Sequence, residues 1–188
     1  MFFTRFFALF FLFASFGIVT SVPSSTAAVE KRQDTDDIET ILNTLKGSTA
    51  IILPQIASVA QSRNASEATV APFISELTTA LNTASSSLAS LQASSGKVRR
   101  QADLDVALLI AGVVTDISDT LDTLLADASA IPDIGGLFTG VDAALHGVLT
   151  GLEILLAGVL TLVADLLVNV AGVLEGLSFG LTLASLGL

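Results

Sequence analysis

The sequence contains no cysteine, no tryptophan, no tyrosine and a single histidine among its 188 residues. Without cysteine, the chain forms no disulfide, no thiolate metal site and no cysteine nucleophile. Basic residues are also scarce, because eight Lys and Arg stand against eighteen Asp and Glu, which gives a net charge of −10. A negative field of this size repels phosphate groups, so we expect no nucleic-acid partner.

No residue pattern indicates catalysis or cofactor binding. His146 has no cysteine or tyrosine with which to form a common nucleophilic site, and neither a G-x-S-x-G motif nor a phosphate-binding loop occurs. Asp116, Asp119 and Asp122 recur at helical spacing, which suits either a weak cation site or, as we expect, a solvated acidic face. We therefore expect a protein that is not an enzyme and carries no metal or cofactor.

The N-terminal region has the pattern of a secretory signal peptide. Arg5 is followed by an apolar run from Phe6 to Val19 and by small residues around Ser21. The run is shorter than the roughly 20 residues of a membrane span, although an uncleaved anchor is the alternative. We assign residues 1–21 to the signal peptide and expect a secreted product.

Two dibasic pairs follow, and each precedes a glutamine. The pairs are Lys31 with Arg32 and Arg99 with Arg100, and both look like sites of a kexin-type protease of the fungal secretory pathway. The first pair would end a pro-segment at residues 22–32. The second is either another cut or a solvated basic loop between helices.

Charge and polarity change at the second dibasic pair. Residues 33–100 contain six carboxylates, five basic residues and many Ser and Thr, whereas residues 101–188 contain eleven carboxylates and no Lys or Arg. We therefore expect two parts, a hydrophilic helical half at 33–100 and an acidic, hydrophobic helical half at 101–188.

One glycosylation sequon lies in the hydrophilic half. It consists of Asn64, Ala65 and Ser66, at a turn expected between two helices. An exposed loop of a secreted protein accepts a glycan, so Asn64 is a candidate glycosylation site.

Apolar residues recur with helical spacing along most of the chain, and no segment alternates as a strand would. The spacing predicts four helices, at residues 34–62, 66–94, 103–130 and 137–175. The acidic cluster at residues 34–37 suits the N-terminus of the first helix, which Gly47 and Pro54 interrupt or bend. Short loops favour an all-α, up-down, four-helix-like bundle, with a C-terminal tail that either packs back on it or remains exposed.

The last predicted helix is long, Gly-rich and highly apolar. Six glycines in this helix and in the residues just after it fall along one small-residue face, namely Gly147, Gly151, Gly158, Gly172, Gly176 and Gly180. Such a face permits close helix packing, and Gly-x-x-x-Gly is also a membrane dimerisation motif. However, a carboxylate recurs every ten to twelve residues from Asp142 to Glu175, and a charge near the bilayer centre costs roughly 2.5–3.5 kcal/mol. We therefore expect a helix buried in a bundle, without stable transmembrane insertion.

Several short strings resemble a known family. They are Lys31-Arg32-Gln33, Leu45-Lys46-Gly47, Ile52-Leu53-Pro54-Gln55-Ile56, Arg99-Arg100-Gln101 and the ending Gly180-Leu181-Thr182-Leu183-Ala184-Ser185-Leu186-Gly187-Leu188. With the signal peptide, they resemble cysteine-free secreted proteins of mushroom-forming fungi. The resemblance implies a matrix or cell-wall protein that helps form aerial hyphae and attach them to hydrophobic surfaces alongside hydrophobins, and it supplies no catalytic residues.

These observations predict a secreted, surface-active structural protein of the fungal wall or extracellular matrix. The half at 101–188 would partition onto a hydrophobic surface or the air–water interface, while the half at 33–100 stays in water. Further partners would be a second copy, hydrophobins or wall polymers. Repulsion between carboxylates would keep the chains apart at neutral pH, and protonation near the reference pKa of about 4 would favour self-association.

Two other functions fit the same sequence. A pro-protein cut at both dibasic pairs would release a peptide signal or effector. A lipid-binding helical bundle would use the glycine-lined final helix to leave room for an acyl chain.

Overall fold

The computed structural model describes residues 26–62, 65–94, 100–101, 103–126, 131 and 134–188. For residues 26–35, 94 and 100–101 only the backbone is described. The predicted signal peptide at residues 1–21 lies outside the described residues, as do the candidate glycosylation site Asn64 and the candidate processing residue Arg99.

The described part of the chain is almost entirely helical. Its helices are α1 (Thr26–Gln61), α2 (Glu67–Ser94), α3 (Leu104–Ala126), α4 (Ile134–Leu155), α5 (Val159–Leu167), α6 (Ala171–Gly176) and α7 (Gly180–Leu186). Two short strands, β1 (Arg100–Gln101) and β2 (Leu156–Ala157), pair in parallel. The predicted all-α bundle is therefore confirmed.

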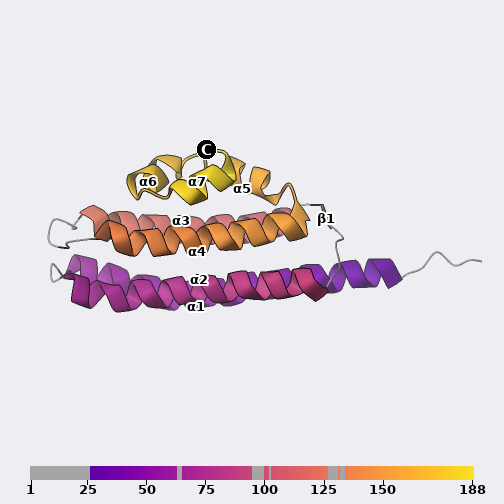
Figure 1. Cartoon of the computed structure of the whole chain (residues 1–188), viewed down its shortest axis with the longest axis horizontal. Helices are drawn as coiled ribbons and strands as arrows, with labels where there is room; N and C mark the ends of the chain where they lie inside the picture. Colours follow the sequence, from indigo (N-terminus) through magenta and orange to yellow (C-terminus); the bar gives the residue numbers. More distant parts are fainter. Residues whose placement is uncertain (1–25, 63–64, 95–99, 102, 127–130, 132–133) are drawn as a thin grey trace, which may run out of the picture.

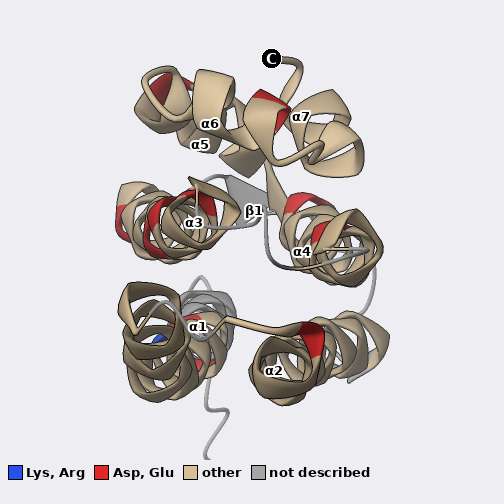
Figure 2. Ribbon diagram, turned by 90° about the vertical axis from the view of Figure 1, so that its left-hand side faces the viewer, with Lys and Arg blue, Asp and Glu red and all other residues tan. Residues whose placement is uncertain are grey.

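The helices stack in three layers. Figure 1 shows α1 beside α2, then α3 beside α4, and finally α5, α6 and α7 on top. In the end-on view of Figure 2, α3 lies over α1 and α4 lies over α2; these pairs pack closely, as do α3 with α5 and α4 with α7. The four long helices thus form the predicted bundle, and residues 159–188, here named the C-terminal layer, cover one side of it.

The first turns of α1 extend past the rest of the bundle. The indigo start of this helix projects beyond its neighbours in Figure 1, and the first buried side chain described in it is Ile38. Because α1 already begins at Thr26, the prediction that the acidic cluster at residues 34–37 caps it is wrong for the uncut helix. The predicted processing residues Lys31 and Arg32 lie in the projecting part. A cut there would leave the cluster in the first turn of a shortened helix, where negative charge is favourable.

Neither Gly47 nor Pro54 interrupts α1, contrary to the predicted break. The helix continues through both residues to Gln61. Both lie on its exposed side, whereas Ile52, Leu53 and Ile56 between and beside them are buried in the core. Packing of these apolar side chains outweighs the backbone hydrogen bond that proline removes.

The two middle helices are buried on two faces instead of one. One buried stripe of α3 consists of large apolar residues at helical spacing, namely Val106, Ile110, Val113, Ile117, Leu121 and Leu124. A second buried stripe runs beside it, at Ala107, Ala111, Val114 and Ser118. Since α3 packs on α1 and also beneath α5 and α6, the second stripe is explained by the C-terminal layer.

The prediction of a single helix at residues 137–175 is wrong. The chain leaves helical geometry at Leu156 and Ala157, where it pairs with β1, and Gly158 adopts a left-handed conformation with φ of 84°. Glycine enters this region without the steric penalty of a Cβ atom. The chain therefore turns back over the bundle, and Phe179, Thr182 and Leu186 become buried, which confirms the packing-back option for the tail.

The C-terminal layer contains one non-glycine residue whose backbone conformation favours glycine. Ser178 follows α6 with φ of 62°, and it donates a backbone hydrogen bond to Glu175 while Phe179 donates one to Leu174, both of 2.9 Å. This is the Schellman pattern, in which glycine is the preferred residue. We expect Ser178→Gly to raise the free energy of unfolding by about 0.5–1 kcal/mol, measured by guanidinium denaturation. Equal stabilisation by Ser178→Ala would contradict this account, because alanine keeps the Cβ atom.

Candidate functional site

Large apolar side chains are exposed mainly in the second half of the chain. Those described are Leu104 and Leu108 at the start of α3, Leu166, Val168, Leu181 and Leu188 in the C-terminal layer, and Ile51 on α1. The other large apolar residues of α3 and α4 are mostly buried between layers. Most of the apolar surface of residues 101–188 is therefore covered in this structure.

Three polar side chains of α4 join it to the C-terminal layer. Asp142, His146 and Glu153 follow one side of the helix, and each forms a hydrogen bond with a residue that lies beyond Leu156. Phe138 lies one turn before Asp142 and meets Phe179 edge to face, with ring centroids 6.5 Å apart and an interplanar angle of 86°. We name Asp142, His146 and Glu153 the polar clamp.

Asp142 is the most buried member of the clamp, with 5% of its surface exposed. Its carboxylate accepts hydrogen bonds from the backbone N–H groups of Leu181, at 3.0 Å, and Thr182, at 2.9 Å, and from the Thr182 Oγ1 hydroxyl, at 2.7 Å. These N–H groups begin α7, where a helix leaves donors without internal partners. A carboxylate there satisfies the donors and opposes the positive end of the helix dipole.

Glu153 performs a similar role at the start of α5. Its carboxylate oxygens accept hydrogen bonds from the backbone N–H groups of Gly158, at 3.1 Å, and Leu160, at 3.3 Å. Gly158 has no side chain with which to cap the helix. Glu153 therefore supplies the cap from the preceding helix and stabilises the chain reversal.

His146 is half-buried and binds Ser185 of α7 through Nδ1. The Ser185 hydroxyl donates its hydrogen to the carbonyl oxygen of Leu181, at 2.8 Å. Because that hydrogen is already used, His146 Nδ1 is the donor to Ser185 Oγ. The single histidine thus links two helices.

The predicted glycine face is divided between different environments. A Cβ atom at Gly147 would lie 3.0 Å from Ser85 Oγ, and one at Gly151 would lie 3.3 Å from Leu88 Cβ, so these two permit the close packing of α4 on α2. At the other four predicted positions a Cβ atom would meet no neighbour within 4 Å; these are Gly158, Gly172, Gly176 and Gly180. The single face is therefore wrong, because the chain turns at Gly158.

The remaining candidates do not form a site together. Among residues with described side chains, no group of three His, Asp or Glu is placed to hold a metal ion, and Asp116, Asp119 and Asp122 are exposed along α3. Arg100 lies in β1, beside Leu156. The structure thus places Arg100, the second residue of that dibasic pair, next to the chain reversal after α4.

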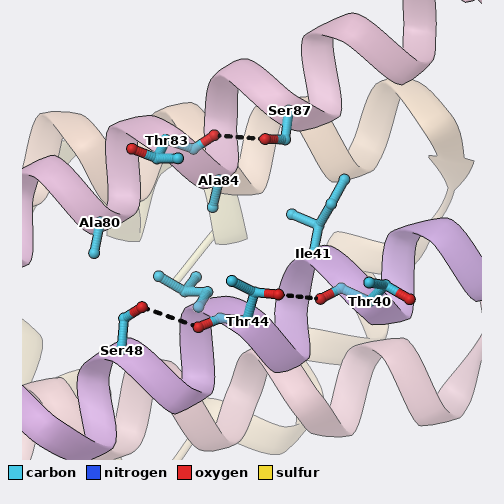
Figure 3. Close-up of a pocket in the computed structure, with 9 residues that line it drawn as sticks. Thr40, Ile41, Thr44, Ser48, Ala80, Thr83, Ala84 and Ser87 are labelled. Atoms are coloured by element: carbon cyan, nitrogen blue, oxygen red, sulfur yellow. Dashed lines mark hydrogen bonds between the residues drawn. The ribbon is translucent and has the colours of Figure 1, made fainter.

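The layer formed by α1 and α2, which lies opposite the C-terminal layer, is rich in hydroxyl groups. A cavity of about 230 Å³ lies between α1 and α2, and its lining is shown in Figure 3. Thr40, Thr44, Ser48, Thr83 and Ser87 line it, and each donates its hydroxyl hydrogen to the carbonyl oxygen four residues earlier, at 2.7–3.0 Å. The rest of the lining is apolar, from Ile41, Leu45, Ala80 and Ala84, so the cavity is uncharged and combines hydroxyl oxygens with apolar side chains.

One helix in the described part, α4, is long and apolar enough to cross a membrane by length and composition. Core helices of bundles pass the same test. Here α4 packs against α2 and α7 and carries the buried carboxylate of Asp142 within its length. Its apolar character is thus accounted for by burial on two sides.

Comparison with known proteins gives one informative match. The chain is 40% identical over 89 residues to fruiting body differentiation protein 16 of Flammulina velutipes, a match that covers 45% of this chain and 70% of that protein. The chain belongs to the family of this fruiting-body protein. No protein-family model matches it. The relationship supports the predicted link to mushroom-forming fungi, and it concerns a protein named for fruiting-body differentiation.

The polar clamp could not be predicted from the sequence. In the sequence, Asp142 and Glu153 are carboxylates that oppose membrane insertion, and Thr182 and Ser185 belong to the C-terminal string. A carboxylate in an apolar helix is itself a signal for a buried partner. The partners of Asp142, however, lie 39 and 40 residues away, beyond the reach of local periodicity.

Proposed function

We propose that the protein is a secreted, non-enzymatic, surface-active structural protein of the fungal wall or extracellular matrix. In this role it aids aerial growth and attachment to hydrophobic surfaces. The observation that carries the proposal is the two-sided build of the molecule, with the hydroxyl-rich pair α1 and α2 on one side and the C-terminal layer on the other.

The two sides differ in the chemistry that they offer. The side formed by α1 and α2 presents Ser and Thr around the cavity of Figure 3 and suits contact with water. The C-terminal layer exposes Leu166, Val168, Leu181 and Leu188 and carries only Asp165 and Glu175 as charged residues. Adsorption of such a molecule at a boundary is favourable, because it removes the apolar side from water and so lowers the free energy.

The relationship to a fruiting-body protein and the signal-peptide pattern support this setting. Aerial fungal structures must cross from water into air, and a secreted protein with one apolar side adsorbs at that boundary. The absence of cysteine means that the protein would act without the disulfides on which hydrophobins depend. We therefore place it in the same setting with a different physical mechanism.

The packing gives less support to the alternative of a released peptide. α1 packs on α3 and α2 packs on α4, so residues 33–100 and 101–188 share one core. A chain cut after Arg100 would expose apolar residues such as Leu42 and Leu81 if its parts separated. Cutting would thus leave two chains held together, and we retain both parts in the proposed active form.

The test is adsorption of the protein purified from culture medium. We expect it to lower the surface tension of water, faster at about pH 3.5 than at neutral pH, since the net charge of −10 at neutral pH is lost in acid and repulsion between copies falls with it. A variant with Leu166→Gln, Val168→Gln and Leu181→Gln should adsorb several-fold more slowly. The control is Ile51→Gln, on the opposite side, which should leave adsorption unchanged. A wild-type protein that stays monomeric at the acidic pH and leaves surface tension unchanged would rule out the proposed function.

A further inference from the structure

The largest apolar surfaces of the second half face each other between layers. The underside of the C-terminal layer consists of buried residues, among them Val163, Leu167, Leu174 and Phe179. α3 packs against α5 and α6 and α4 packs against α7, and Phe138 of α4 meets Phe179 edge to face. The apolar area buried at this interface is therefore larger than the apolar area of the few exposed side chains on the outside. Adsorption through the interface would bring more apolar surface into contact with air or oil.

The C-terminal layer is the part of the described structure least able to stand alone. Its helices have nine, six and seven residues, whereas isolated helices below about 12–15 residues are marginal in water. α1 and α2 have 36 and 28 residues, and α4 is closely packed on α2 at Gly147 and Gly151. Local opening therefore begins at the C-terminal layer and not between the long helices.

The C-terminal layer is joined to α4 through a glycine, Gly158. Within the described residues the chain passes from α4 into the layer only through Leu156, Ala157 and Gly158. Gly158 has φ of 84°, and a Cβ atom there would meet no neighbour within 4 Å. Glycine has access to backbone angles that other residues avoid, and Gly158 has no side chain of its own that packing holds in place.

The polar clamp holds the layer closed in water. Asp142, His146 and Glu153 bind its helices directly, and these hydrogen bonds are exchanged for bonds to water when the layer lifts. Hydrogen bonds to carboxylates are stronger than the average hydrogen bond in a protein, so the clamp opposes opening in water. An air or oil boundary replaces the apolar contacts of the closed state, and this gain is what opens the layer.

We propose that the C-terminal layer lifts from α3 and α4 at an apolar boundary, hinged at Gly158, and that the two surfaces thus uncovered are what the protein applies to air or oil. This inference rests on the proposed surface activity and adds its mechanism. The exposed leucines of the layer make first contact, and opening then enlarges the adsorbed area. α1 and α2 remain on the water side.

A reversible crosslink tests the opening directly. Asp142 and Thr182 are hydrogen-bonded to each other across the boundary between α4 and the layer, so the paired substitutions Asp142→Cys and Thr182→Cys put a thiol on each side of it in a chain with no other cysteine; loss of free thiols on oxidation confirms that the crosslink has formed. When oxidised, this variant should raise surface pressure about tenfold more slowly than the same protein after reduction, because the crosslink suppresses local opening. The reduced form is the matched control, since it has the same sequence.

The outcomes separate the two proposals. If the oxidised and reduced forms adsorb equally fast and as fast as wild type, the protein is surface-active without opening and the inference is overturned. If wild type does not adsorb at all, the proposed function fails and the mechanism fails with it. Circular dichroism of both forms checks that the crosslinked bundle is folded.

Hydrogen exchange of the wild-type protein provides a test that needs no variant. In the presence of a hexadecane emulsion, amides of residues 159–186 should exchange at least several-fold faster or change their protection pattern, while those of α2 keep theirs. Identical exchange of both regions with and without the emulsion, while the protein is bound to the droplets, would overturn the inference.

Discussion

Replacement of Phe179 by alanine is expected to undock the C-terminal layer while the four long helices stay folded. Phe179 is fully buried, and truncation of a buried phenylalanine costs about 3–5 kcal/mol. Its edge-to-face contact with Phe138 adds to the loss. Because the short helices of the layer are marginal without such packing, we expect this loss to undock the layer.

Hydrogen exchange measured by mass spectrometry checks this expectation. Amides of residues 159–186 should lose their protection, whereas those of α2 should keep it. The matched control is Leu181→Ala, because Leu181 is 47% exposed and exposed substitutions change stability by only about 0.5 kcal/mol. Equal loss of protection in α2 would show that the molecule unfolds as one unit and that the layer has no independent opening.

The long helices could be predicted from the sequence because their pattern is local. The apolar spacing of residues 66–94 gave α2 at Glu67–Ser94, and the stripe from Val106 to Leu124 is buried as expected. An amphipathic helix shows its packing face through residues three and four positions apart. The apolar spacing predicts the helix correctly even at Pro54, a residue that disfavours helix.

The break after α4 could not be predicted because its causes lie far apart along the chain. The pairing of β2 with β1 joins residues 156–157 to residues 100–101, and Asp142 binds residues 39 and 40 positions later. Neither contact changes the local apolar pattern, which reads as helix on both sides of Gly158. Glycine in such a pattern indicates a helix face or a turn equally well.

The structure also changes the meaning of the apolar composition of residues 101–188. Composition suggested a half that meets a boundary directly, but α3 and α4 form the middle of three layers and are buried on two sides. Their high apolar content is what a doubly covered helix requires. Under the proposed opening, these helices meet a boundary only when the C-terminal layer lifts, which ties the proposed function to the stability of that layer.

The glycines of α4 provide the second large expected effect, since Gly151→Val should weaken the packing of α4 on α2. Its new Cβ atom would lie 3.3 Å from Leu88 Cβ and 3.5 Å from Leu88 Cδ1, and the two methyl groups of valine cannot both turn away, because its χ1 angle is restricted in helices. Overpacking of this kind typically costs about 1–3 kcal/mol. Leu88 is itself fully buried, so it has little room to move.

Guanidinium unfolding of Gly151→Val and of the matched control Gly172→Val measures this effect. Gly172 belonged to the same predicted small-residue face, but in the structure it lies in α6, with no neighbour within 4 Å of a new Cβ atom. The control should change stability by less than about 0.5 kcal/mol, because valine and glycine differ modestly in helix propensity. If both variants lost equal stability, a continuous packed glycine face would be the better description, and the turn at Gly158 would lose its support.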